Sequence, residues 1–115
     1  MPGQVLLVSR NDLLVAEVEQ ALEGPDAAVF VARDHLEAIL FLDREPCDVV
    51  LLDVENGGAE GFAFCRVVRR SWNVGIMLLL HSAAQRDIVL GYQMGADGYM
   101  ALPFDNRELA ARVDG

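Results

Sequence analysis

Six residues share one expected position, at or just after the carboxyl end of a short apolar run: Ser9, Arg10, Asp53, Leu80, His81 and Leu102. Ligands of open parallel sheets bind outside the carboxyl ends of the strands, so these side chains are the first candidates for chemistry. Asp53 is the one carboxylate among them. The sequence has neither a GxGxxG nor a GxxxxGK[ST] loop, which argues against a dinucleotide or P-loop site.

The apolar pattern alternates between strand-like runs and helical spacing. Continuous apolar runs predict buried strands over residues 5–8, 28–32, 49–52, 75–80 and 98–101. Helical spacing follows each run, over residues 13–22, 36–42, 60–70, 82–94 and 106–113. Five βα units in succession predict an α/β fold with a parallel sheet covered by helices on both faces.

Polar residues mark the expected ends of these helices. Asn11 or Asp12 can cap the first helix, Asp34 the second and Ser82 the fourth, because a short side-chain oxygen satisfies free backbone N–H groups. Gly95 is typical of the residue that closes a helix, here the fourth.

Length and composition predict one domain over residues 1–115. The chain has 53% hydrophobic residues and a formal net charge of −9, with nine Arg and no Lys. This balance argues against direct binding to a nucleic-acid backbone, which needs a basic surface. Cys47 and Cys65 form no CxxC pair, and we expect both to be small buried apolar side chains. Without a signal peptide or an apolar span in the sequence, we expect a cytoplasmic location and no membrane partner.

Three segments of the chain resemble the receiver domain of bacterial two-component response regulators. They are VLLVSRND, DVVLLDVENGGAEGFAFCRVVR and DIVLGYQMGADGYMALPFDNRELAARV, at spacings that fit the family without large gaps. The resemblance implies a doubly wound, flavodoxin-like (βα)5 fold with strand order 2-1-3-4-5. The final segment is most similar to the winged-helix, OmpR-type class, which implies a DNA-binding output domain outside this chain.

The same resemblance implies a phosphoryl transfer to Asp53. In the family an acidic pair holds Mg²⁺ with that aspartate, while a Thr or Ser and a Lys bind the phosphoryl oxygens. Here the acidic pair falls on Ser9 and Arg10, the hydroxyl position on Leu80 and the Lys position on Leu102. We therefore expect weak or lost Mg²⁺ binding, no resident cofactor and no enzymatic activity.

Three functions stay open for this substituted site. The first is an atypical receiver that acts through protein–protein contacts without phosphorylation. The second is a phosphorylatable receiver that uses Asp53 with unusual neighbours. The third is a flavodoxin-like domain that binds a small molecule in a pocket between Arg10, Leu80 and Leu102.

Two environments are expected for Asp53 itself. It is either a partly exposed carboxylate that accepts hydrogen bonds from backbone amides, or the partner of Arg10 in a fixed ion pair at the position of the metal. A metal site at His81 has little support, because no other potential ligands cluster with it in the sequence.

The resemblance also implies a dimerisation face formed by the fourth helix, fifth strand and fifth helix. Asp97 and Arg112 are the expected ion pair of a symmetric dimer on this face. Tyr99 falls at the position of the family's switch aromatic, and it is either a mobile switch or a fixed surface ring. A sensor kinase is a further possible partner, and DNA would be bound only through the output domain.

Overall fold

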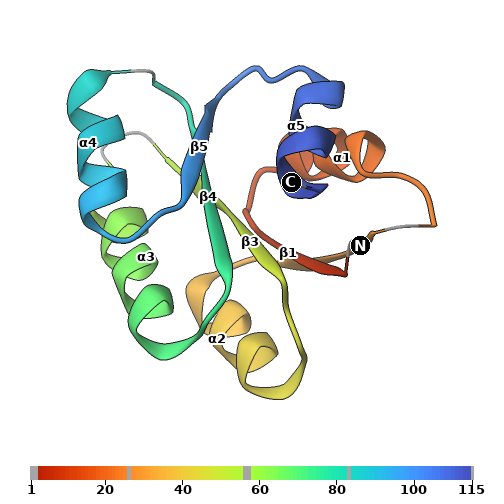
Figure 1. The fold of residues 1–115 in the computed structure, drawn as a ribbon, viewed down its shortest axis with the longest axis horizontal. Helices are drawn as coiled ribbons and strands as arrows, with labels where there is room; N and C mark the ends of the chain where they lie inside the picture. Colours follow the sequence, from red (N-terminus) through yellow and green to blue (C-terminus); the bar gives the residue numbers. More distant parts are fainter. Residues whose placement is uncertain (1–2, 26, 56–57, 83, 115) are drawn as a thin grey trace.

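The computed structural model describes residues 3–25, 27–55, 58–82 and 84–114, which form five strands alternating with five helices (Figure 1). The strands are β1 (Gln4–Val8), β2 (Ala28–Ala32), β3 (Val49–Val54), β4 (Gly75–Leu80) and β5 (Gly98–Ala101). The helices are α1 (Asp12–Ala21), α2 (His35–Arg44), α3 (Ala59–Ser71), α4 (Gln85–Gln93) and α5 (Asn106–Asp114). The predicted alternation of five βα units is confirmed.

The strands form one parallel sheet in the order β2-β1-β3-β4-β5, as expected. β3 lies at the centre, between β1 and β4. Val8 at the end of β1 pairs with Leu52 of β3, so the next residues along the two strands, Ser9 and Asp53, are neighbours at the carboxyl edge.

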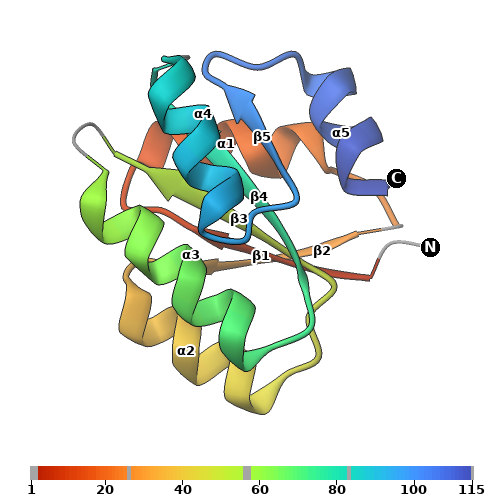
Figure 2. The ribbon, with the colours of Figure 1, turned by 60° about the vertical axis from the view of Figure 1, so that its left-hand side comes forward.

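Helices cover both faces of the sheet, with α1 and α5 on one face and α2, α3 and α4 on the other (Figure 2). Side chains of a strand alternate between the two cores: Leu7 and Leu51 pack toward α1 and α5, whereas Leu6 and Leu52 pack toward the other three helices. This double coverage explains why each strand reads as a continuous apolar run. Burial of each such leucine contributes roughly 1.5–3 kcal/mol to folding.

Three predicted helix boundaries are confirmed. The Asn11 side chain accepts a hydrogen bond from the backbone N–H of Leu14 at 3.1 Å, and Asp34 accepts one from Glu37 at 2.8 Å. Gly95 follows α4 with a φ of 106°, a left-handed conformation that favours glycine.

The prediction that Ser82 caps α4 is wrong. The helix begins at Gln85, and its first flanking residue, Ala84, provides no side-chain hydrogen bond. Ser82 instead accepts a hydrogen bond from the backbone N–H of Ala84 at 3.2 Å, because its hydroxyl reaches an amide two residues on, before the helical backbone begins. Within the described residues, no helix has the length and apolar character needed to cross a membrane.

Candidate functional site

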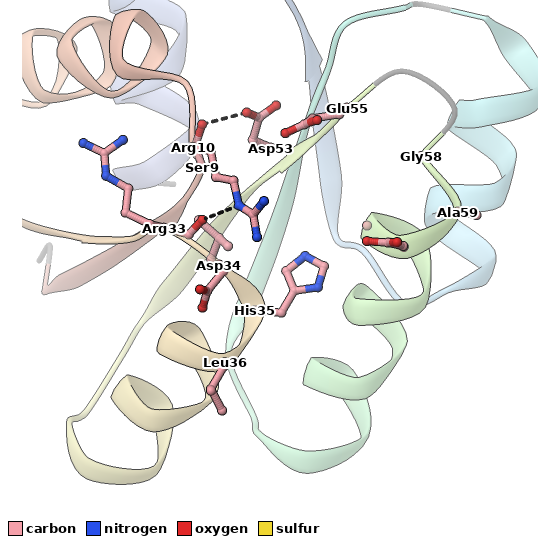
Figure 3. A pocket seen from close by; sticks show the side chains of 13 residues that line it. Ser9, Arg10, Arg33, Asp34, His35, Leu36, Asp53, Glu55, Gly58 and Ala59 are labelled. Atoms are coloured by element: carbon pink, nitrogen blue, oxygen red, sulfur yellow. Dashed lines mark hydrogen bonds between the residues drawn. The ribbon is translucent and has the colours of Figure 1, made fainter.

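The Asp53 carboxylate is buried at the carboxyl edge of the sheet, and its side chain is only 2% exposed. One oxygen, Oδ2, lies 2.6 Å from Ser9 Oγ, and the other, Oδ1, lies 2.6 Å from His81 Nε2 (Figure 3 shows the contact with Ser9). An ionised carboxylate only accepts hydrogen bonds, so the hydroxyl and the imidazole N–H are the donors. The expectation of a partly exposed carboxylate bonded to backbone amides is therefore wrong.

The order of the strands brings these three residues together. Ser9 follows β1, Asp53 lies near the end of β3 and His81 follows β4, and the three strands are adjacent in the sheet. The Ser9 hydroxyl also accepts a hydrogen bond from the backbone N–H of Asn11 at 3.0 Å. Asp53 is thus linked on one side to the start of α1 and on the other to the residues after β4.

The predicted ion pair between Arg10 and Asp53 is wrong. The Nε group of Arg10 donates to the backbone oxygen of Arg33 at 3.1 Å. Its guanidinium group points into the cleft toward His35 and away from Asp53 (Figure 3). Ser9 and Arg10 follow β1 where the chain bends, and their side chains diverge: Ser9 turns to Asp53, and Arg10 turns to Arg33, just before α2.

A cleft of about 700 Å³ lies beside Asp53, between the ends of β1 and β3 and the first turns of α2 and α3 (Figure 3). Its charged lining is mixed: it includes the acidic residues Asp34, Asp53, Glu55 and Glu60, the arginines Arg10 and Arg33, and His35. This mixture gives the cleft no uniform preference for an anion or a cation.

His35 fixes one wall of the cleft. Its ring stacks on Phe64, with ring centres 4.1 Å apart and an angle of 5° between the planes. Burial lowers the pKa of His35 below its ordinary value, and the nearby Glu60 acts in the opposite direction. The neutral ring is therefore favoured, and it serves as a packing surface between α2 and α3.

The predicted small-molecule pocket between Arg10, Leu80 and Leu102 is not formed by the described residues. Leu80 is 2% exposed and packs in the core beneath α3 and α4. Leu102 packs in the core on the opposite face, against α1 and α5, and it does not line the cleft. The two leucines are separated because each one completes a different core.

The residues around Asp53 do not fit Mg²⁺. The metal prefers near-octahedral coordination by oxygen ligands, usually including one or two carboxylates and several water molecules. Here both Asp53 oxygens are already hydrogen-bonded, and the nearby Ser9 and Arg10 add no further carboxylate. Within the described ranges, no group of three or more His, Cys, Asp or Glu side chains is arranged to hold a metal ion.

Asp97 and Arg112, the expected pair of a dimer face, each have partners within the chain. Asp97 accepts hydrogen bonds from Arg69 Nη2 at 2.5 Å and from the backbone N–H of Ile76 at 2.8 Å. Arg112 donates to the backbone oxygen of Tyr99 at 3.1 Å and to Glu108 at 3.3 Å. The pairing of Asp97 with Arg112 between two copies stays a prediction.

The Tyr99 ring is half-buried and packs against the core beneath α2, α3 and α4. It also meets the ring of Tyr92 edge to face, with ring centres 6.4 Å apart. This contact joins β5 to α4. The choice between a mobile switch and a fixed ring for Tyr99 stays open.

Five parallel strands in the order 2-1-3-4-5 with five helices define a flavodoxin-like α/β fold. Residues 5–114 match the model of the response regulator receiver domain, and the chain therefore belongs to this family of two-component signalling proteins.

Solved structures agree with that family. A response regulator from Thermotoga maritima is 28% identical, with a TM-score of 0.92 over 99% of this chain and 96% of that chain. The receiver domain of the Francisella response regulator 1452 is 22% identical, with a TM-score of 0.86 over 96% and 93%. HP1043, an orphan response regulator of H. pylori, is 21% identical, with a TM-score of 0.83 over 96% and 92%. The last two likenesses bear on the fold alone.

His81 is the site residue whose role sequence reasoning missed. A signal was available, because His81 follows the strand next to the one that carries Asp53. Among the two cysteines, Cys65 is buried as predicted, whereas Cys47 is only half-buried. Burial raises the pKa of Cys65 to about 11, so its thiol is not an activated nucleophile.

Proposed function

We propose that this receiver acts through contacts with other proteins and without Mg²⁺-dependent phosphorylation of Asp53. The observation that carries the proposal is the environment of the carboxylate. One oxygen is hydrogen-bonded to Ser9 and the other to His81, each at 2.6 Å. The Asp53 side chain is only 2% exposed. A metal ion or a phosphoryl donor would have to displace these partners.

The energetics of a phosphorylated state support the proposal. A phosphoryl group on Asp53 would add negative charge where the family's hydroxyl and amine positions hold Leu80 and Leu102. Burying charge without partners is expensive. Each stabilising group lost from an active site lowers the rate on the order of 10²-fold, although such losses are not additive. Little phosphotransfer is expected from a site that lacks the metal pair, the hydroxyl and the amine together.

The proposal includes an output role of the winged-helix, OmpR-type class, on the strength of the segment PFDNRELAARV. DNA would then be bound by an output domain and not by this acidic domain. A second copy of the chain or a sensor kinase are the partners that the family suggests. Val89 and Tyr92 of α4, which are 45% and 49% exposed, offer apolar surface for a symmetric dimer through α4, β5 and α5.

Calorimetric Mg²⁺ titration of three proteins tests the first part of the proposal. The wild type is expected to bind Mg²⁺ weakly. The double variant Ser9→Asp with Arg10→Asp restores the acidic pair and frees Asp53 from the hydroxyl, so its affinity should rise at least about tenfold. Arg10→Ala is the matched control, because it removes the cation without adding a ligand. Tight binding by the wild type, or no gain in the double variant, would contradict the proposal.

Beryllofluoride with Mg²⁺ tests the alternative of a phosphorylatable receiver. Backbone NMR shifts of the wild type should stay unchanged on addition of the mixture. Large shifts around Asp53 and Tyr99 would instead support the alternative and overturn the proposed function.

Sedimentation of the wild type and Arg112→Glu tests the dimer face. If Arg112 pairs with Asp97 of a second copy, reversing its charge should raise the dimer dissociation constant several-fold. Arg70→Glu, an exposed change on α3, is the control and should leave the constant unchanged. A wild type that stays monomeric at high concentration would remove the dimer from the proposal.

A further inference from the structure

Within the described part of the chain, His81 makes the one side-chain hydrogen bond between Asp53 and the residues that follow β4. The contact is short, 2.6 Å from Nε2 to Oδ1, and the imidazole ring is 28% exposed at the edge of a second groove. Glu55, Arg86 and Asp87 line the same groove, but the hydrogen-bond partner of the ring is Asp53.

The backbone on both sides of His81 is connected to other elements. The residue before it, Leu80, accepts a hydrogen bond through its backbone oxygen from the N–H of Leu102 at 2.8 Å, which joins β4 to the end of β5. The residue after it, Ser82, accepts a hydrogen bond through its hydroxyl oxygen from the backbone N–H of Ala84 at 3.2 Å, directly before α4. A displacement of His81 would therefore act on both β5 and α4.

Close packing couples α4 to the strands beneath it. A Cβ atom added at Gly91 of α4 would lie 2.6 Å from Leu78 Cδ1, so the helix backbone rests directly on β4. Tyr92 of α4 meets Tyr99 of β5 edge to face. Packed cores resist continuous deformation, and a change at the start of α4 is expected to reach this aromatic contact.

We propose that His81 is a positioning residue: its hydrogen bond to Asp53 holds the chain after β4, and through it α4 and the end of β5, in one arrangement without a phosphoryl group. This inference rests on the proposed function and describes how the same site acts. In phosphorylatable relatives, the resemblance assigns the link between the acceptor site and the end of the fourth strand to a hydroxyl that binds the phosphoryl group. Here a side chain of the protein itself makes the link.

Amide hydrogen exchange, measured by NMR on the wild type and four variants without Mg²⁺ or beryllofluoride, tests the inference. The reporters are the N–H groups of Leu102 and Ile88, which donate to Leu80 and Ala84. His81→Ala should raise their exchange rates on the order of tenfold, because one charge-assisted hydrogen bond is lost. The amide of Leu51 in the sheet centre serves as the reference for global unfolding.

Two amide variants separate positioning from mere polarity. In His81→Gln the Nε2 atom stands the same number of bonds from Cα as in histidine, so it can donate to Asp53 and should restore wild-type exchange. In His81→Asn the amide nitrogen is one bond nearer to Cα, and exchange should stay as fast as in His81→Ala. Ser82→Ala is the control, because it removes a polar side chain from the next residue, which makes no hydrogen bond to Asp53. In this variant the exchange rate of Ile88 should rise less than in His81→Ala.

Several results would overturn the inference. Wild-type exchange at Leu102 and Ile88 in His81→Ala would show that the contact holds nothing in place. Rescue by Asn as complete as rescue by Gln, or no rescue by Gln, would show that the bond to Asp53 is not the cause. A rate increase that is equal at Leu51 would reduce His81 to a general stabilising role. None of these results depends on whether Asp53 binds beryllofluoride, so the proposed function can fail separately.

Discussion

Two aspartates at opposite edges of the sheet have contrasting partners. Asp97 lies just before β5, at the amino edge, and is bonded to the Arg69 guanidinium. Arg69 also donates to the backbone oxygens of Gly95 at 2.9 Å and Val74 at 2.9 Å. Asp53, at the carboxyl edge, has a hydroxyl and an imidazole as partners instead of a guanidinium.

The difference separates an exposed carboxylate held by a guanidinium from a buried carboxylate held by uncharged or weaker donors. A guanidinium is always charged and presents a rigid set of donors, so Arg69 clamps three acceptors of the loops before β4 and β5. The Asp53 carboxylate is far more buried than that of Asp97, with side chains 2% and 62% exposed, yet it has the weaker set of donors. A buried carboxylate gains stability from its partners only as far as they offset the loss of its hydration, so the two aspartates should respond differently to substitution.

The largest expected effect is at the amino edge. Arg69→Ala removes the partner of Asp97 and of two backbone oxygens, and should lower the free energy of unfolding by about 2 kcal/mol. Urea denaturation followed by circular dichroism measures the change. Arg70→Ala, the next and exposed arginine of α3, is the control and should change it by less than about 0.5 kcal/mol. Equal effects of the two variants would contradict the claim that the hydrogen bonds of Arg69 stabilise the amino edge of the sheet.

A smaller effect is expected at the carboxyl edge. Asp53→Asn removes the buried charge and keeps an oxygen acceptor for the Ser9 hydroxyl, but its amide nitrogen replaces the acceptor of His81. These effects oppose each other, so the free energy of unfolding should change by less than about 1 kcal/mol in either direction. The same denaturation experiment measures it. A loss of unfolding free energy greater than that of Arg69→Ala would show that Asp53 contributes more to stability than the Arg69–Asp97 pair, the opposite of what we expect.

The stability of the protein should depend on pH through His35, which lines the cleft. Because burial lowers the pKa of His35 in the folded state, the unfolded chain binds its proton first as the pH falls. The contribution of His35 to stability is thus fully present above its ordinary pKa of 6.5 and is lost as the pH falls through the lowered value. His35→Phe, which retains the stacking on Phe64, should flatten this part of the stability curve. An identical slope in both proteins between about pH 7 and pH 5 would contradict the assignment.

The smallest effect concerns the cysteines. Cys65 is fully buried with a pKa raised to about 11, whereas Cys47 is only half-buried, and burial also raises its pKa. A thiol reagent should therefore modify Cys47 at least about tenfold faster than Cys65. Single Cys→Ser variants assign the two rates, and faster reaction of Cys65 would indicate that α3 opens more readily than its packing suggests.

The fold could be predicted almost completely from the sequence. Apolar runs such as Val5–Val8 and helix caps such as Asn11 and Asp34 report local structure, because strand burial and capping depend on neighbouring residues. Ser82 shows the limit of this reasoning. Its residue type suits a helix cap, but a turn that uses the same hydroxyl delays the helix until Gln85.

The candidate site could be predicted in its members but not in its contacts. The places of Asp53, Leu80 and Leu102 at the ends of their strands can be read from the sequence, whereas the direction of Arg10 depends on side-chain geometry. Arg10 binds the backbone of Arg33 instead of the carboxylate. The register of β1, β3 and β4 brings Ser9 and His81, and not Arg10, to Asp53.

The most direct test of the central claim is the intact mass of the protein after incubation with Mg²⁺ and acetyl phosphate. We expect no mass increase in the wild type or in Asp53→Asn, because the Asp53 carboxylate is enclosed by Ser9 and His81. Addition of one phosphoryl group per chain in the wild type, absent in Asp53→Asn, would contradict the account.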